Sequence, residues 1–132
     1  MEKAAVQFVG MGKTKLLEPG ASEKVTVSVD RYFLASYDTY GAEGYIMSAG
    51  DYYLAVGNSA HDALNNILAA KGYTAADGMD ADGNADLTYT WNQEQLDTDS
   101  YRYSEENGTE VTNQFDFADL NYYGIDLSLI HI

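Results

Sequence analysis

The residues best suited to bind a ligand lie in the acidic stretch 77–86, where carboxylates alternate with small residues. Counted from Asp80, oxygen-bearing side chains occupy positions one, three and five of a possible EF-hand loop: Asp80, Asp82 and Asn84. One more carboxylate, Asp86, follows them. An EF-hand needs glycine at position six and a bidentate glutamate at position twelve, but these positions hold Ala85 and Trp91. We therefore expect an acidic, glycine-broken loop, with a weak, irregular calcium site as the alternative.

A second candidate is the Gly-Met-Gly-Lys-Thr run at residues 10–14, whose end resembles a phosphate-binding loop. The Walker A pattern needs a glycine where Gln7 stands, and it needs a helix directly afterwards. Here Pro19 and Gly20 follow and break the chain instead. The run is therefore expected to be a bend between two strands, and no phosphate site is assigned.

The remaining chemistry-bearing residues give no catalytic set. His61 stands without a second metal ligand at helical spacing, so we expect a surface or packing residue. Trp91, Tyr101 and Tyr103 could stack on sugar rings, although aromatic side chains more often pack a core or an interface. The acids within residues 115–123 lie close in sequence, which is no evidence for acid–base geometry. No catalytic, cofactor-binding or metal-binding residue is assigned, and no cofactor is expected.

Composition and charge exclude several classes of protein. The 132 residues include no cysteine, so disulfide frameworks and thiolate metal sites are excluded. No apolar run approaches the ~20 residues of a membrane span, and residues 1–25 do not resemble a signal peptide. A cytoplasmic location and no membrane partner are therefore expected.

The acidic charge is concentrated in the second half of the chain. Residues 1–60 carry 7 acidic and 5 basic side chains, whereas residues 61–132 carry 14 acidic and 2 basic ones. Such a surface repels phosphates, so we expect no nucleic-acid partner. A solvated, soluble face is the simplest interpretation of this acidity.

The elements that would position these residues are mostly strands. The run 50–59 is apolar on both faces and bounded by glycine, which predicts a central strand of a sandwich. Residues 24–30 alternate valine with polar residues, which predicts a strand whose valines face the core. Three further short strands are expected in these segments: 4–9, 32–38 and 45–47. Five strands are two short of an immunoglobulin-like sandwich, and nothing later obviously supplies the others.

Residues 59–72 predict a helix with both ends marked. Ser59 is the expected N-cap with Asp62 as its capping-box partner, and Gly72 suits the C′ position. The apolar face would consist of Ala63, Leu64, Ile67 and Leu68. Beyond the helix, the pattern of residues 87–91 predicts a strand.

Several of these segments together resemble a known family. Residues 17–27, 34–38 and 49–59 resemble the fibronectin type III-like domain of glycoside hydrolase family 3, which consists mostly of β-glucosidases. Segments 61–72, 77–79, 89–91 and 112–123 resemble bacterial members in which the sandwich precedes the catalytic barrel.

The resemblance implies a mainly β fold: a partial immunoglobulin/fibronectin type III-like sandwich with one short α-helix and an irregular acidic extension. We expect an incomplete sandwich at 1–59, a helix at 60–72, an acidic linker towards a catalytic barrel at 73–124, and a non-native tail at 125–132. The implied function is a non-catalytic accessory module of a β-glucosidase-like glycoside hydrolase, so this segment itself would not be the enzyme. Its partners would be the catalytic domains of the same parent chain and that enzyme's oligo- or disaccharide substrate.

Two alternatives stay open. The chain could be a stand-alone immunoglobulin-like module that binds carbohydrate or a protein partner. An acidic calcium-binding module would rest only on Asp80, Asp82, Asn84 and Asp86. Whether Trp91, Tyr101 or Tyr103 approach the active site of a parent enzyme is also left open.

Overall fold

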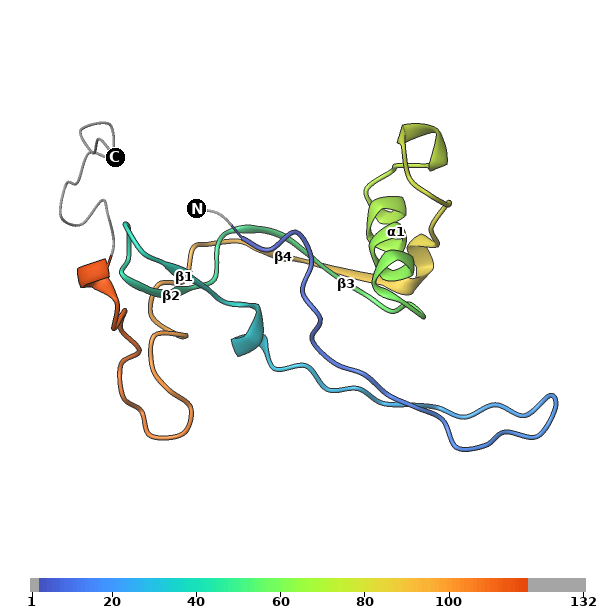
Figure 1. The fold of residues 1–132 in the computed structure, drawn as a ribbon, viewed down its shortest axis with the longest axis horizontal. Helices are drawn as coiled ribbons and strands as arrows, with labels where there is room; N and C mark the ends of the chain where they lie inside the picture. Colours follow the sequence, from blue (N-terminus) through green and yellow to red (C-terminus); the bar gives the residue numbers. More distant parts are fainter. Residues whose placement is uncertain (1–2, 119–132) are drawn as a thin grey trace, which may run out of the picture.

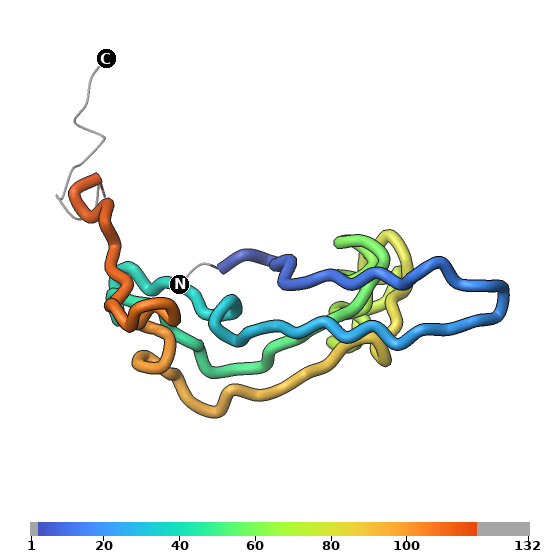
Figure 2. Tube along the Cα trace, turned by 90° about the horizontal axis from the view of Figure 1, so that it is seen from below, coloured from blue at the N-terminus to red at the C-terminus, as the bar shows by residue number. Residues whose placement is uncertain are grey.

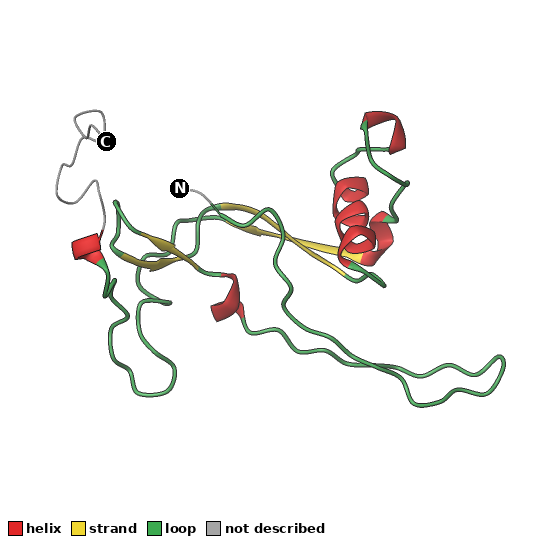
Figure 3. Cartoon of the chain, viewed as in Figure 1, coloured by secondary structure: helices red, strands yellow, loops and turns green. Residues whose placement is uncertain are grey.

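The computed structural model describes residues 3–118 of the chain (Figure 1). The expected tail at 125–132 and the acids beyond residue 118 lie outside the described residues. Loops and strands dominate the described part, and its single α-helix lies at one end (Figure 3).

Two small antiparallel sheets form the β part. Strands β1 (Ser36–Asp38) and β2 (Gly44–Ile46) make one hairpin. Strand β3 (Gly50–Ala55) pairs along its whole length with β4 (Thr88–Gln93). The strand expected at 87–91 is thus confirmed, and it supplies the partner of β3 that the sequence did not reveal.

Helix α1 (Ala60–Ala70) forms where it was predicted, and its caps explain its ends. The Ser59 hydroxyl accepts from the backbone N–H of Asp62, and the Asp62 carboxylate accepts from the N–H of Asn58. The first bond satisfies a donor of the first helical turn. The second binds the residue before the N-cap, whereas a capping box would place the Asp62 carboxylate on the N–H of Ser59 itself. At the other end Gly72 has φ +92°, the left-handed conformation expected of a C′ glycine.

Short 3-10 turns connect the other elements. They are η1 (Arg31–Leu34), η2 (Ala75–Asp77), η3 (Ala85–Leu87) and η4 (Asp116–Ala118). The strand expected at 32–38 is therefore half wrong, because η1 takes its first part and β1 begins only at Ser36.

The acidic second half returns along the first half and holds the β1–β2 hairpin. The backbones of Met47 and Asp97 exchange two hydrogen bonds of 2.9 Å. The Arg102 guanidinium donates to the carbonyl oxygen of Ala42 at 2.8 Å and forms an ion pair with Glu110 at 2.9 Å. Much of the segment expected to be a linker, 73–124, is thus joined to the β part by strand pairing and side-chain bonds, although its role as a linker stays a prediction.

Residues 4–30 form a long two-legged arm that projects past the rest of the molecule (Figures 1 and 2). Its tip is the expected tight turn, in which the N–H of Ala21 donates to the carbonyl oxygen of Glu18 and Gly20 has φ +79°. Gly10 and Gly12 face Val27 and Val25 of the other leg so closely that a Cβ would not fit.

The strands expected at 4–9 and 24–30 are wrong, because neither leg of the arm forms a ladder. Within residues 3–118 the only backbone hydrogen bond inside the arm is the one at the turn. The valines predicted to face a core are 40% (Val25) and 44% (Val27) exposed, since no second layer covers them.

The buried core is small. Among apolar side chains of the described residues, only Ile46 and Met47 are buried, and Asn65 and Asn66 are the buried polar ones. The expectation that β3 is covered on both faces is also wrong, since no β3 residue is buried and β4 is its one partner in the described sheet. Within residues 3–118, no helix is both long and apolar enough to cross a membrane.

Candidate functional site

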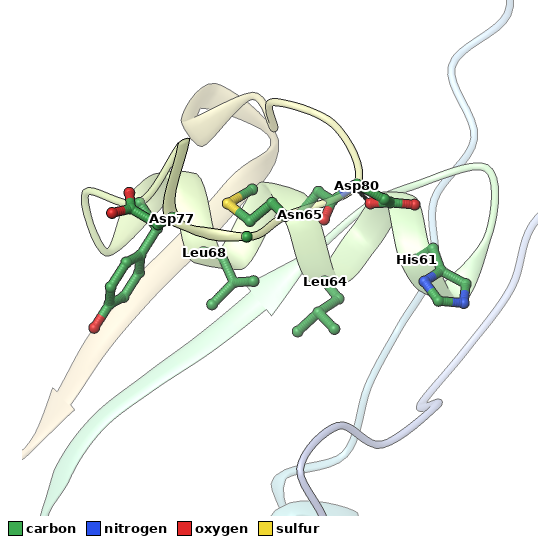
Figure 4. Close-up of a pocket in the computed structure, with 9 residues that line it drawn as sticks. His61, Leu64, Asn65, Leu68, Asp77 and Asp80 are labelled. Atoms are coloured by element: carbon green, nitrogen blue, oxygen red, sulfur yellow. Dashed lines mark hydrogen bonds between the residues drawn. The ribbon is translucent and has the colours of Figure 1, made fainter. Parts of the chain in front are cut away.

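A groove of about 460 Å³ lies between α1 and the loop that follows it (Figure 4). We call it the α1 groove. Its apolar lining comes from Leu64 and Leu68 on the helix and from Tyr73 and Met79 on the loop. The polar side chains that line it are these: His61, Asn65, Asp77 and Asp80.

Two adjacent asparagines of α1 hold the loop that forms the groove. The Asn65 amide donates to the Asp80 carboxylate at 2.7 Å. Asn66, which is 1% exposed, donates to the carbonyl oxygen of Val56 and accepts from the N–H of Asn84, both at 2.8 Å. Sequence reasoning missed both residues because it assigned only apolar side chains to the packed face of the helix.

Gly83 brings the loop close to the helix. A Cβ at this position would overlap the carbonyl oxygen of Asn65 and the backbone nitrogen of Asn66. Only glycine permits such an approach of two backbones. Gly83 therefore has a packing role and is not part of a calcium loop.

The groove carries negative charge at neutral pH. The hydrogen bond from Asn65, and to a lesser extent the nearby imidazole of His61, lower the pKa of Asp80 below its ordinary 3.8. Asp77 accepts from the backbone N–H of Thr74 at 2.9 Å, which caps η2. His61 is an exposed residue of the first helical turn, as expected, and lies at the edge of the groove.

The four residues considered for calcium do not converge on one point. Asp80 binds Asn65, the Asp82 carboxylate accepts from the N–H of Ala75, and Asn84 accepts from the N–H of Asp86. The side chains of Asp80, Asp82 and Asn84 therefore bind the loop backbone or the helix. Within the described residues no group of three or more His, Cys, Asp or Glu side chains is arranged to hold a metal ion.

A row of aromatic rings lies along the β3–β4 sheet. Tyr52 and Trp91 are direct cross-strand partners with ring centroids 5.3 Å apart and an angle of 15°. Tyr89, which is 67% exposed, lies 6.1 Å from Trp91 at 27°. The guanidinium of Arg31 lies 5.7 Å from the centre of the Trp91 ring, a cation–π distance.

The other sequence candidates lie apart from these two surfaces. Residues 10–14 belong to the extended arm, with no helix after them, so the structure supplies none of the backbone geometry of a phosphate loop. Tyr101 lies 6.2 Å from Tyr32, ring centre to ring centre, and the backbone oxygen of Tyr103 accepts from the Tyr32 hydroxyl at 2.6 Å. Neither is placed beside Trp91 by a direct contact.

Comparison with known proteins gives two similarities. Residues 1–60 match the family model of the fibronectin type III-like domain. Over 63 residues the chain is 35% identical to β-glucosidase A of Butyrivibrio fibrisolvens, which is 46% of this chain and 8% of that enzyme. The chain thus aligns with a small part of the relative's length. No solved structure matches.

Residues 1–60 are therefore similar to a fibronectin type III-like domain. This confirms the fold class expected from the sequence, a mainly β domain consistent with a sandwich, here with two small antiparallel sheets and one helix. The resemblance of residues 17–27, 34–38 and 49–59 to a fibronectin type III-like domain is confirmed by the family model, and the similarity to a β-glucosidase agrees with it. Membership of glycoside hydrolase family 3 stays a prediction.

Proposed function

We propose that this chain is a non-catalytic accessory module of a β-glucosidase-like enzyme of glycoside hydrolase family 3. The observation that carries the proposal is the fibronectin type III-like match over residues 1–60 together with the similarity to a β-glucosidase. The enzyme would hydrolyse terminal β-glycosidic bonds of oligo- or disaccharides. The module's role would be to brace the catalytic domains.

The distribution of apolar surface supports a bracing role. Within residues 3–118 the arm contributes seven of the exposed large apolar side chains: Val6, Phe8, Met11, Leu16, Leu17, Val25 and Val27. Large exposed apolar surface often marks a protein–protein contact. The partners of this surface would be the catalytic domains of the same polypeptide.

A segment exchange in β-glucosidase A of Butyrivibrio fibrisolvens tests the proposal. One variant of that enzyme loses its matching 63-residue segment, and a second carries the segment of this chain in its place. We expect the deletion to lower the melting temperature and the activity on aryl β-glucosides, and the exchange to restore most of both. An exchange that behaves like the deletion would contradict the bracing role.

The chain on its own should not turn over aryl β-glucosides. Retaining and inverting glycosidases both need a positioned pair of carboxylates, and no such pair is assigned in this chain. Measurable turnover that disappears when a carboxylate of this chain is replaced would contradict a non-catalytic role.

A second function, carbohydrate binding by a stand-alone module, is favoured by the aromatic row of β3 and β4. Tyr89 and Trp91 offer amphipathic rings of the kind that pack at binding surfaces. Titration calorimetry with cello-oligosaccharides tests it with Tyr89→Ala, using Tyr103→Ala as the control at an exposed tyrosine away from this row. Binding that Tyr89→Ala abolishes would favour this function over bracing alone.

A further inference from the structure

The leucines of α1 that line the α1 groove are only half-buried. Leu64 and Leu68 lie one turn apart on the helix and contribute to the floor of the groove (Figure 4). The buried residues of the same helix are Asn65 and Asn66. Burial of asparagine beside partly exposed leucine reverses the usual distribution of polar and apolar side chains. The helix therefore offers an apolar floor that its own chain leaves partly uncovered.

Two carboxylates line the same groove without a cationic partner. The one ion pair of residues 3–118 joins Arg102 to Glu110, so it neutralises neither Asp77 nor Asp80. Among the described residues that line the groove there is no lysine or arginine. Oδ2 of Asp77 accepts from the N–H and the hydroxyl of Thr74, and within the described part of the chain its Oδ1 accepts no hydrogen bond. An outside cation would thus find acceptors at the edge of an apolar floor.

The groove is long enough for a few residues of extended chain. Its lining on α1 runs from His61 to Leu68, which is about 10 Å along the helix axis. An extended chain rises by about 3.3 Å per residue, so about three residues match this length. Figure 4 shows Asp77 beside the Leu68 end and Asp80 towards the His61 end. A segment that runs along the groove passes both acids, whereas a compact amine meets one of them.

The charge of the chain indicates what kind of molecule the groove attracts. The net charge is −14, and even residues 1–60 carry 7 acidic against 5 basic side chains. Two copies of this chain therefore repel each other, whereas a basic partner is attracted by the whole molecule and by the two acids of the groove.

We propose that the α1 groove binds a short, extended, basic segment of a partner protein other than a copy of this chain. The central side chain of that segment is apolar and contacts Leu64 and Leu68. A lysine or arginine on each side of it reaches one acid of the groove, Asp77 at one end and Asp80 at the other. This inference does not depend on the accessory function proposed above.

Proton–nitrogen NMR spectra of the full chain, titrated with the peptide acetyl-Gly-Lys-Phe-Lys-Gly-amide, test the proposal. We expect saturable shifts of the amide signals of Leu68 and Gly78, with a dissociation constant below about 1 mM at low salt. Two control peptides replace both lysines by glutamate or the phenylalanine by serine, and each should bind at least fivefold more weakly. n-Butylammonium supplies the cation without the segment and should also bind at least fivefold more weakly.

Variants with equal charge separate the groove from the general acidity of the chain. Asp77→Asn/Asp80→Asn removes two charges from the groove but keeps an acceptor oxygen for Thr74 and for Asn65. It should raise the dissociation constant of the peptide at least fivefold. Asp86→Asn/Asp99→Asn removes two charges at exposed positions outside the groove lining and should raise it less than twofold. The helical circular dichroism signal of both variants shows whether α1 is still folded.

Three outcomes would overturn the proposal. The peptide could leave the signals of Leu68 and Gly78 unchanged, or the two double variants could weaken binding equally while both keep their helical signal. The second outcome would assign the binding to the overall charge of the chain. n-Butylammonium could also bind as tightly as the peptide, in which case the groove accepts a small amine and not a segment of a protein.

Discussion

At the scale of single residues, the two buried asparagines of α1 decide how the acidic loop is held. Asn66 is the more buried of the two, and its side chain makes two hydrogen bonds to the backbone. It donates to the carbonyl oxygen of Val56, which precedes the helix, and accepts from the N–H of Asn84, which follows it. It therefore joins the end of the β3 segment to the start of η3 through one side chain. Its loss leaves the carbonyl oxygen of Val56 and the N–H of Asn84 without this partner.

Asn66→Ala should lower the free energy of unfolding by about 1–3 kcal/mol, because a side chain that is 1% exposed loses two hydrogen bonds to the backbone. Asn92→Ala is the matched control, since Asn92 also donates at 2.8 Å, to Asp51, but at an exposed position. It should cost less than about 1 kcal/mol. Urea unfolding measures both, and an equal loss for the two variants would contradict the role of burial.

Asp80 gives a prediction for pH. Its pKa is lowered in the folded chain, so the unfolded chain binds more protons between the folded pKa and the ordinary 3.8. The stabilisation is complete above the ordinary value and is lost as the pH falls through the folded pKa. The γ-carboxyl carbon of Asp80, followed by NMR, should titrate below 3.8, and in Asn65→Ala the midpoint should move up. An unchanged midpoint would show that the 2.7 Å hydrogen bond is not its cause.

At the scale of elements, local signals were predicted well and long-range pairing was not. The helix at 59–72 was predicted within two residues because Ser59, Asp62 and Gly72 act on neighbouring backbone groups. Alternation in residues 24–30 gave no information on whether a second layer would cover Val25 and Val27. The pairing of β3 with β4 joins distant parts of the chain, and no local pattern encodes it.

The same distinction applies to the candidate site. The acidic residues 77–86 were recognised as a possible site, but carboxylates alone do not reveal which backbone N–H each one binds. The groove depends on Asn65 and Asn66, whose side chains bridge positions that lie 10 to 18 residues away. Two adjacent asparagines within an otherwise apolar helical pattern were the available signal, because polar side chains on a packed face need buried partners.

Trp91 connects β3 to β4 and offers a direct probe of their pairing, since the chain has one tryptophan. Trp91→Ala should cost about 1.5–3 kcal/mol, less than a fully buried tryptophan, because the ring is half-buried against Tyr52. In the wild type, Trp91 fluorescence should change together with the helical signal on unfolding. Separate transitions would show that the acidic half detaches from residues 1–60 on its own.

At the scale of the whole molecule, little apolar surface is removed from water. Within residues 3–118, two apolar side chains are buried and many are exposed, among them Leu16 at 99%, Phe8 at 78% and Phe115 at 70%. Hydrophobic burial is the main favourable term of folding. We therefore expect the chain alone to be marginally stable.

Calorimetry checks this expectation through the heat capacity of unfolding. A compact domain shows about 12–15 cal/mol/K per residue, and this chain should fall clearly below that range with a broad transition. A dilution series is the control, because self-association would sharpen the transition. A sharp, cooperative melt of the diluted monomer with a full heat-capacity change would contradict marginal stability.

The β3–β4 pairing also determines the order in which the chain can fold. Ala55 and Thr88 close the shortest loop of the sheet, and Gly50 and Gln93 close the longest. Helix α1 lies inside that loop and, through Asn66, already brings Val56 near Asn84. The entropy of closing the first pair is thus reduced, so the ladder should grow from Thr88 towards Gln93. Pulse-labelled hydrogen exchange should show Val56 protected before Met47, whose bond to Asp97 lies beyond the far end of the ladder.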